Sequence, residues 1–235
     1  DTFANRFPDP VLQQVENFYS PVDTQNNSFK VVSKYFDRIT RPEQIISSLP
    51  QALQIMLDQS DCGPAVISLS QDVQGEAFEY PEIFFEEKIH EIRRIHPDQN
   101  QLKKAADTIK HSSKPIIISG GGVLYSEAEK ELSAFAKKHN IPVTTTIMGI
   151  GCMDRDDPYY VGPIGGLGVG SANNLSKDTD LAIAIGTKLG DFTTGSWSNF
   201  YNSSFKLLSI NSARFDVTKH LSVPLISDAK IALIE

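Results

Sequence analysis

Short apolar runs alternate with amphipathic stretches through residues 98–235. The runs are PIIIS, IPVTTT, LAIAIG, KLLSIN and VPLIS. Stretches with helical spacing flank them, such as Leu102, Ala105, Ala106 and Ile109 before the first run. Strands that are apolar throughout and separated by helices are typical of a parallel sheet covered on both faces. The pattern therefore predicts a doubly wound, Rossmann-like α/β domain over 98–235.

Residues 1–74 carry a sparser pattern of the same kind. It predicts a helix over 9–19, a strand over 28–36, a helix over 40–57 and a strand over 63–70. Thr40 and Glu43 form a capping-box pattern where the second helix begins. Pro50 lies inside that helix and is expected to kink it or to remove one hydrogen bond.

Residues 75–97 join these two parts. They carry charges and aromatic side chains without a clean period and without a cluster of turn residues. We interpret the stretch as a linker, with an amphipathic helix over 83–94 as the alternative.

Composition and charge narrow the class of protein. The chain has 40% hydrophobic and 22% charged residues, which is typical of a soluble globular protein. A net charge of -7 argues against nucleic acid or an anionic membrane as a partner, because both require a basic surface. No apolar run reaches the ~18 residues of a membrane span, and the first residues show no signal peptide.

The cysteine and histidine residues give little sign of a metal site or of disulfides. Cys62 and Cys152 stand far apart, which favours a reduced, cytoplasmic setting. The five histidines are scattered, so no metal site is expected. The chain opens on Asp1 and ends in what looks like the first turns of a helix, so we expect an internal piece of a longer protein.

Four glycine-bearing loops follow the predicted strands of 98–235. They contain GGG at 120–122, IMGIG, GPIGGLGVG and GTKLGDFTTGS, and they should meet at the carboxyl edge of the sheet, where ligands bind in such domains. The dinucleotide fingerprint fails, because Tyr125 stands where its third glycine belongs. The second strand also ends in Thr146, where an acidic residue would hold a ribose. The glycines either make tight turns or line a pocket that is not a classical NAD site.

The order of motifs along the chain resembles a known family. FKVVSKYFDRITRPEQI, GPAVISLSQDVQ, KPIIISGGGV, IPVTTTIMGIG, DPYYVGPIGGLG, DLAIAIGTKLGDFTTGS and SDAK follow one another over nearly the whole length. In this order they resemble thiamine-diphosphate enzymes of the acetohydroxyacid synthase type. DTFANRFPDPVLQQVE, LSQDVQGEAFEYPE and GDFTTGSW further resemble the family members that hydrolyse a C–C bond of a cyclic dione in myo-inositol degradation.

The resemblance implies a particular domain organisation. Residues 1–74 would be the C-terminal part of a pyrimidine-binding α/β domain and 98–235 the central domain, while the diphosphate-binding domain is absent. Thiamine diphosphate and Mg²⁺ would then be bound mainly outside this chain, which contains no catalytic residue and no metal ligand. The fragment alone would be inactive. The intact enzyme would be a homo-oligomer acting on a small, polyol-derived cyclic dione.

Two residues of the first part carry over from the family to its active-site channel. Phe3, in DTF, and Lys34, in SKYF, match positions near the mouth and along the wall of that channel. Core packing for Phe3 and a solvated strand end for Lys34 are the alternatives.

The family's flavin-binding loops match the central part only incompletely. The candidate residues of this vestigial nucleotide pocket are Gly120, Gly121, Gly122, Met148, Gly165, Gly186 and Lys188. However, Lys188 and Phe192 stand where the family's flavin-contacting arginines are, and Leu167 replaces a histidine. Arginine binds phosphate bidentately and lysine only as a point charge, so FAD is not expected to bind.

Two other functions remain open at this point. An acetohydroxyacid synthase-like carboligase would share the fold and the cofactor but use keto acids. An FAD- or nucleotide-binding module would be yellow as purified.

Overall fold

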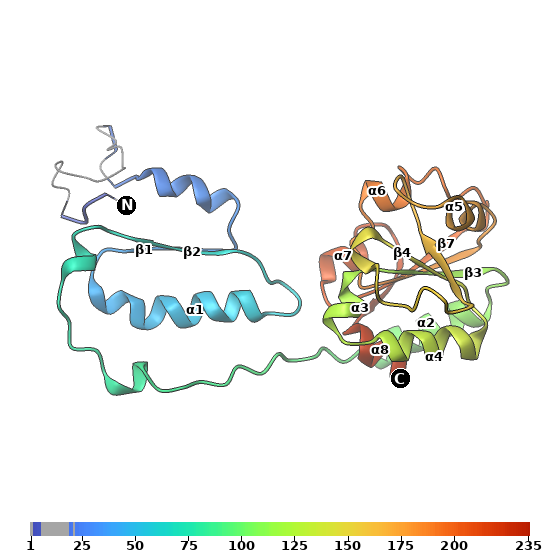
Figure 1. Cartoon of the computed structure of the whole chain (residues 1–235), viewed down its shortest axis with the longest axis horizontal. Coiled ribbons are helices and arrows are strands. Elements are labelled where there is room, and N and C mark those ends of the chain that lie inside the picture. The colour runs from blue at the N-terminus through green and yellow to red at the C-terminus, as the bar shows by residue number, and fades with distance from the viewer. Residues whose placement is uncertain (1, 6–18, 21) are drawn as a thin grey trace. The chain divides into compact units, whose positions relative to one another are not determined.

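The computed structural model describes residues 2–5, 19–20 and 22–235 and divides the chain into two compact units (Figure 1). Unit 1 covers 1–93 and unit 2 covers 94–235. Of the helix predicted over 9–19, all but Tyr19 lies outside the described residues. Among the described helices, none is long and apolar enough to cross a membrane.

Unit 1 is built on a two-stranded parallel sheet. Its elements are the 3-10 helix η1 (Gln25–Val31), β1 (Tyr35–Ile39), η2 (Pro42–Gln44), α1 (Ile45–Leu57), β2 (Ala65–Leu69), η3 (Val73–Gly75) and η4 (Glu82–Phe84). The strands run in register from Tyr35 beside Ala65 to Ile39 beside Leu69. α1 continues through Pro50, and its most buried side chains are Ser48 and Ala52.

Three predictions for unit 1 need correction. The strand predicted over 28–36 begins only at Tyr35, because the preceding residues form η1 and leave Val31 88% exposed. The capping partner before α1 is Gln44 rather than Glu43: its side-chain Oε1 accepts from the backbone N–H groups of Thr40 (2.7 Å) and Arg41 (3.1 Å). The alternative helix over 83–94 does not form, and only η4 interrupts an extended segment there.

Unit 2 is a doubly wound α/β domain, as the apolar runs predicted. Its elements are α2 (Gln99–Lys110), β3 (Pro115–Ser119), α3 (Gly121–Tyr125), α4 (Glu129–His139), β4 (Val143–Thr145), η5 (Ile147–Gly149), β5 (Tyr160–Pro163), α5 (Gly170–Lys177), β6 (Leu181–Ile185), α6 (Asp191–Thr194), β7 (Lys206–Asn211), α7 (Arg214–Thr218), β8 (Val223–Ile226) and α8 (Ala229–Ile234). All neighbouring strands are parallel, in the order β5-β4-β3-β6-β7-β8. The chain reverses its direction of travel across the sheet between β3 and β6, which is the position of the ligand crevice in Rossmann folds.

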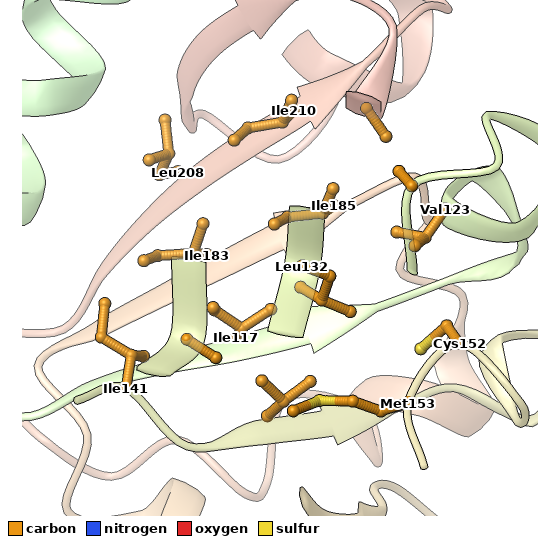
Figure 2. Packing of buried hydrophobic residues seen from close by; sticks show 14 of the residues in the cluster. Ile117, Val123, Leu132, Ile141, Cys152, Met153, Ile183, Ile185, Leu208 and Ile210 are labelled. Carbon is orange, nitrogen blue, oxygen red and sulfur yellow. The ribbon is translucent and has the colours of Figure 1, made fainter. Parts of the chain in front are cut away.

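Alternating side chains of the central strands pack on opposite faces of the sheet. Ile117 of β3 and Ile183 of β6 belong to the core beneath α2, α4 and α8 (Figure 2). Ile116, Ala182 and Ala184 face the second core, which α5 and the aromatic residues of the segment 197–205 cover. Since both faces are buried, β6 is apolar at every position and β3 at every position except its last, Ser119.

Two further details of unit 2 differ from the predicted pattern. β5 was not predicted, because its four residues include a glycine and a proline and its pairing with β4 contains a register shift. Ser126 and Glu129 have the spacing of a capping box, which predicts that Ser126 caps this helix. The N-cap of α4 is instead Ala128, and the hydroxyl of Ser126 donates to Asp228 Oδ2 at 2.8 Å.

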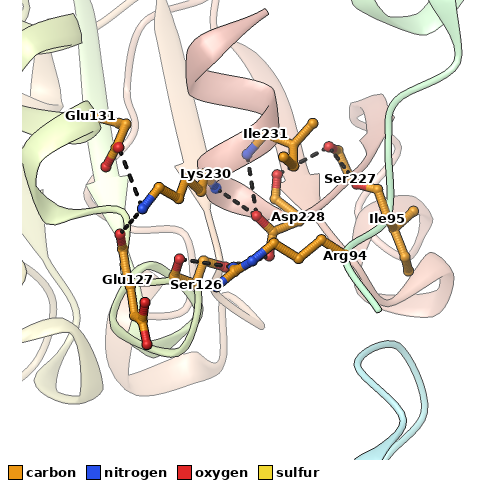
Figure 3. Close-up of polar contacts among 9 residues, drawn as sticks. All are labelled: Arg94, Ile95, Ser126, Glu127, Glu131, Ser227, Asp228, Lys230 and Ile231. Atoms are coloured by element: carbon orange, nitrogen blue, oxygen red, sulfur yellow. Dashed lines mark hydrogen bonds and ion pairs between the residues drawn. The ribbon is translucent and has the colours of Figure 1, made fainter. Parts of the chain in front are cut away.

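Asp228 is the centre of a buried polar cluster at the start of α8 (Figure 3). Its carboxylate is fully buried, accepts from Arg94 Nη1 at 3.0 Å and from the Ser126 hydroxyl, and caps α8 through the amides of Lys230 and Ile231. The Asp228 amide donates to the carbonyl of Ile95 at 2.8 Å. The cluster therefore anchors the first residues of unit 2 to α8 and to the turn between α3 and α4.

Asp180 fixes the turn before β3 to the beginning of β6. Its carboxylate accepts from the Ser112 hydroxyl and from the amides of Ser113 (2.7 Å) and Lys114 (3.0 Å). Burial by itself would raise the pKa of Asp180, but these hydrogen bonds outweigh it and hold the pKa below its usual value.

This pKa shift predicts a pH dependence of stability. A carboxyl group with a depressed pKa stabilises the fold above its unfolded-state pKa and loses that contribution as the pH falls through the folded-state value. Asp180→Asn should therefore be less stable than the wild type at pH 7, and the difference should narrow below about pH 4. Urea unfolding at several pH values checks this, with exposed Asp178→Asn as the control. A difference that stays constant down to pH 2.5 would contradict the prediction.

The two cysteines should differ sharply in reactivity. Cys152 is fully buried, its Sγ lies 2.9 Å from the Ser119 hydroxyl, and burial raises the pKa of the thiol. Cys62 is exposed. With the thiol reagent DTNB at pH 8, we expect one thiol group per folded chain to react rapidly and both thiol groups to react after unfolding. The rapid reaction should disappear in a Cys62→Ser variant. Fast reaction of Cys152 in that variant would show the structure to be wrong at this point.

Candidate functional site

The glycine loops meet at the carboxyl edge of the unit 2 sheet, where β3 and β6 lie side by side. The amide of Gly122 donates to the carbonyl of Gly186 at 2.9 Å, and the amide of Gly120 donates to the carbonyl of Ile185 at 2.8 Å. Two amides of the triple glycine are thus committed to the neighbouring strand and loop. A phosphate cradle would need them directed at the ligand.

The contact between Gly122 and Gly186 leaves no space for a side chain on either residue. A Cβ on Gly122 would lie 2.5 Å from the Gly186 Cα, and a Cβ on Gly186 would lie 2.6 Å from the Gly122 Cα. Gly186 also has a φ of +61°, a conformation that favours glycine. These two glycines are therefore required for direct packing of one backbone on another.

The loops after β5 and β6 are joined in the same way. The amide of Gly166 donates to the carbonyl of Phe192 at 2.7 Å, and a Cβ on Gly165 (φ +99°) would lie 2.0 Å from that same oxygen. The loop after β4 is close as well, because a Cβ on Gly121 would lie 3.2 Å from the Met148 carbonyl oxygen. The structure thus brings the glycine candidates and Met148 to one edge, held together through backbone.

The side chains at this edge are mostly apolar. Met148, Leu167 and Phe192 are 66%, 66% and 74% exposed. Lys188 is exposed and is the only basic residue in the loops 120–126, 146–151, 164–170 and 186–195. A flavin or nicotinamide dinucleotide carries a pyrophosphate, and these loops offer it one point charge and no bidentate donor. The residues present do not fit such a group.

Unit 1 holds the two remaining candidates. Lys34 is half-exposed, and its ammonium group pairs with Asp61. Phe3 is half-buried in the segment Thr2–Asn5, which lies at the carboxyl end of β1 and β2. Both residues belong to unit 1, whereas the glycine loops belong to unit 2.

Two charged residues that the motif analysis missed hold the segment around Phe3. Asp72, just after β2, accepts from the amides of Ala4 (Oδ1, 2.8 Å) and Asn5 (Oδ2, 3.1 Å). Arg38, in β1, donates through Nη2 to both the carbonyl oxygen and the hydroxyl of Thr2, each at 3.1 Å. A signal was available in the sequence, since Asp72 lies in the quoted motif LSQDVQ directly after a strand.

The pKa values of this pair follow from its surroundings. Burial would raise the pKa of Asp72, but hydrogen bonds from the amides of Ala4, Asn5 and Val73 lower it below the usual value. Burial lowers the pKa of Arg38, and the negative charge of Asp72 opposes that effect. Both groups are charged at neutral pH, which favours the hydrogen bonds that they make.

Comparison with known proteins decides the family. Residues 102–235 match the family model described as thiamine pyrophosphate enzyme, central domain. The chain belongs to the thiamine pyrophosphate enzyme family. That match covers most of unit 2, including all of the glycine loops.

Relatives of this family member extend the similarity over both units. The chain is 45% identical over 233 residues to the 3D-(3,5/4)-trihydroxycyclohexane-1,2-dione hydrolase of Bacillus velezensis, covering 99% of this chain and 37% of that protein. The proteins of the same name from Clostridium tetani and Clostridium perfringens are 43% and 44% identical, over 99% and 100% of this chain and 36% and 37% of their own lengths. The chain thus spans little more than a third of these relatives.

Solved structures of the family share the fold. Benzoylformate decarboxylase from Polynucleobacter necessarius aligns with a TM-score of 0.69 at 23% identity, over 92% of this chain and 40% of that one. An enzyme from Mycobacterium smegmatis, assigned to the thiamin diphosphate-dependent class, aligns with a TM-score of 0.66 at 20% identity, over 86% and 38%. At this level of identity the likeness concerns the fold alone.

The described part of this family member contains no cluster of metal-ligating side chains. Within residues 2–5, 19–20 and 22–235, no three His, Cys, Asp or Glu side chains come together in a way that could hold a metal ion.

Proposed function

We propose that this chain is part of a thiamine-diphosphate-dependent hydrolase that cleaves a C–C bond of trihydroxycyclohexane-1,2-dione to a 5-deoxy sugar acid in myo-inositol breakdown. The observation that carries the proposal is the 43–45% identity to proteins named as hydrolases of this dione, which runs through both units. Similarity confined to unit 2 would support only a central domain of this family.

The proposal assigns each part of the chain to a domain of the intact enzyme. Residues 1–74 form the C-terminal part of a pyrimidine-binding domain, 75–97 a linker, and 98–235 the central domain. Thiamine diphosphate and Mg²⁺ are bound mainly by residues outside this chain. The contribution of this chain to the active site is then Phe3 and Lys34, which line the substrate channel.

The central domain keeps the architecture of a nucleotide site without the nucleotide. The committed amides of Gly120 and Gly122 and the apolar side chains of Met148 and Phe192 support this. The proposed location is the cytoplasm, in keeping with the two free cysteines. The intact enzyme is proposed to be a homo-oligomer.

A substrate comparison tests the proposal. The protein is produced with the flanking regions expected from its relatives, supplied with thiamine diphosphate and Mg²⁺, and offered either the cyclic dione or pyruvate. We expect hydrolysis of the dione, no consumption of pyruvate, and no flavin absorbance in the purified protein. Pyruvate consumption would favour the carboligase, and a stoichiometric flavin band would show that the glycine loops hold a nucleotide.

A further inference from the structure

Phe3 is held on both sides by charged side chains from the ends of the two unit 1 strands. On one side Arg38 binds Thr2 through two hydrogen bonds, and on the other Asp72 binds the amides of Ala4 and Asn5. Phe3 itself contributes no polar side-chain group to these contacts. The polar contacts therefore fix the backbone on either side of a residue that is itself half-buried.

We infer that Arg38 and Asp72 are positioning residues that fix Phe3 at the carboxyl end of β1 and β2, where substrate reaches it. The consequence for catalysis rests on the proposed function, while the fixed position of the segment does not. Four hydrogen bonds from two side chains fall on three of these four consecutive residues, Thr2, Ala4 and Asn5, and tie the segment to the two strands.

The chemistry of the two residues suits this task. Both carboxylate oxygens of Asp72 are used, one on each of two successive amides, which defines the direction of the peptide chain and not only its proximity. The single nitrogen Nη2 of Arg38 reaches the main chain and the side chain of Thr2 together. The negative charge of Asp72 also favours the charged form of Arg38.

The location of the segment supports a functional reason for holding it. In α/β proteins with parallel strands, ligands bind beyond the carboxyl ends of the strands. Arg38 is the fourth of the five residues of β1, and Asp72 follows the end of β2 by three residues. An aromatic side chain fixed there can contact a ligand, and a misplacement of about 1 Å at such a position costs roughly a hundredfold in rate.

The first part of the test measures position alone. In the 235-residue chain, Asp72→Asn should speed amide hydrogen exchange at Ala4 and Asn5 by about tenfold, because one acceptor is replaced by a donor. Arg38→Lys keeps the charge but loses the planar guanidinium group, and it should also speed hydrogen exchange in this segment. This variant replaces Asp72→Asn in the test if Asp72→Asn does not fold. Glu43→Gln, an exposed acid in the same unit, is the matched control and should leave these amides unchanged.

The second part uses a double-mutant cycle in the full-length enzyme with the cyclic dione. Introduced into the wild-type enzyme, Asp72→Asn should lower kcat/KM about tenfold or more. Introduced into a Phe3→Ala variant, it should lower kcat/KM less than about twofold, because Asp72 acts on catalysis only by positioning Phe3. A purely structural role would give the same loss in both backgrounds and would overturn the inference. So would exchange rates at Ala4 and Asn5 that do not respond to either variant.

Failure of the proposed function looks different. If the wild-type enzyme does not hydrolyse the dione at all, the proposed function is wrong, and the exchange rates alone then decide whether Arg38 and Asp72 fix the segment.

Discussion

Asp228→Ala is expected to lower the free energy of unfolding of unit 2 by about 2–3 kcal/mol, because it removes the carboxylate partner of the half-buried Arg94 together with a helix cap. The fully buried carboxylate accepts hydrogen bonds from Arg94, Ser126 and two amides of α8. Without it, the guanidinium group of Arg94, whose side chain is 33% exposed, has no carboxylate at this site. The first turn of α8 also loses its capping acceptor.

Urea unfolding followed by tryptophan fluorescence measures this loss. Trp197 is the only tryptophan and lies in unit 2, so the signal reports that unit. Asp98→Ala is the matched control, because Asp98 caps α2 through two amides without a buried ion pair, and about 1 kcal/mol is expected there. Asp228→Asn keeps a capping oxygen, so its loss of unfolding free energy should lie between those of Asp228→Ala and Asp98→Ala. An Asp228→Ala loss no larger than that of Asp98→Ala would contradict the ion-pair argument.

Gly186→Ala is expected to destabilise unit 2 by about 3 kcal/mol. The new Cβ would lie 2.6 Å from the Cα and 2.8 Å from the carbonyl carbon of Gly122, and the residue would have to keep a left-handed backbone. Overpacking typically costs about 1–3 kcal/mol and the left-handed conformation about 1–2 kcal/mol. The same fluorescence measurement applies.

Gly190→Ala is the control for the glycine contact. Gly190 lies four residues further along the same loop, has a φ of -68°, and its added Cβ would meet no atom within 4 Å. The free energy of unfolding of this variant should change by less than about 1 kcal/mol, because a gain from the unfolded state is offset by the poorer N-cap that alanine makes for α6. Equal stability of Gly186→Ala and Gly190→Ala would show that the close approach of Gly122 and Gly186 is absent in solution.

The fold of unit 2 could be predicted from sequence because its strands are buried on both faces. An apolar residue at each position of LAIAI has one interpretation in a chain of alternating strands and helices, and the structure confirms it. β5 could not be predicted in the same way, because Gly162 and Pro163 interrupt its pattern and tertiary contacts with β4 decide its formation.

Unit 1 shows where pattern alone fails. The apolar residues Phe29, Val31 and Val32 suggested a strand, yet they lie in or beside η1 and are 48%, 88% and 66% exposed. Local hydrogen bonds of the 3-10 type, such as that from Val32 N–H to the Phe29 carbonyl, organise this segment instead. Whether apolar residues form a strand depends on a neighbouring strand, which sequence periodicity does not report.

The candidate site was predictable in type but not in detail. Glycines at the strand ends predicted that the loops lie together at one edge of the sheet. They did not predict that the backbones of Gly122 and Gly186 pack against each other. The anchors of Phe3 depend on contacts between residues 67 or 68 positions apart for Asp72 and 36 apart for Arg38. Nothing local in the chain marks such pairs, because the fold alone brings them together.

Cofactor dependence of dione hydrolysis tests the proposed function most directly. The full-length protein is stripped of thiamine diphosphate and Mg²⁺ by dialysis against a chelator, and hydrolysis of trihydroxycyclohexane-1,2-dione is measured before and after both are restored. We expect no hydrolysis in the stripped protein and recovery only when both are present. Hydrolysis that persists without the cofactor, or that is absent with it, would contradict the proposed function.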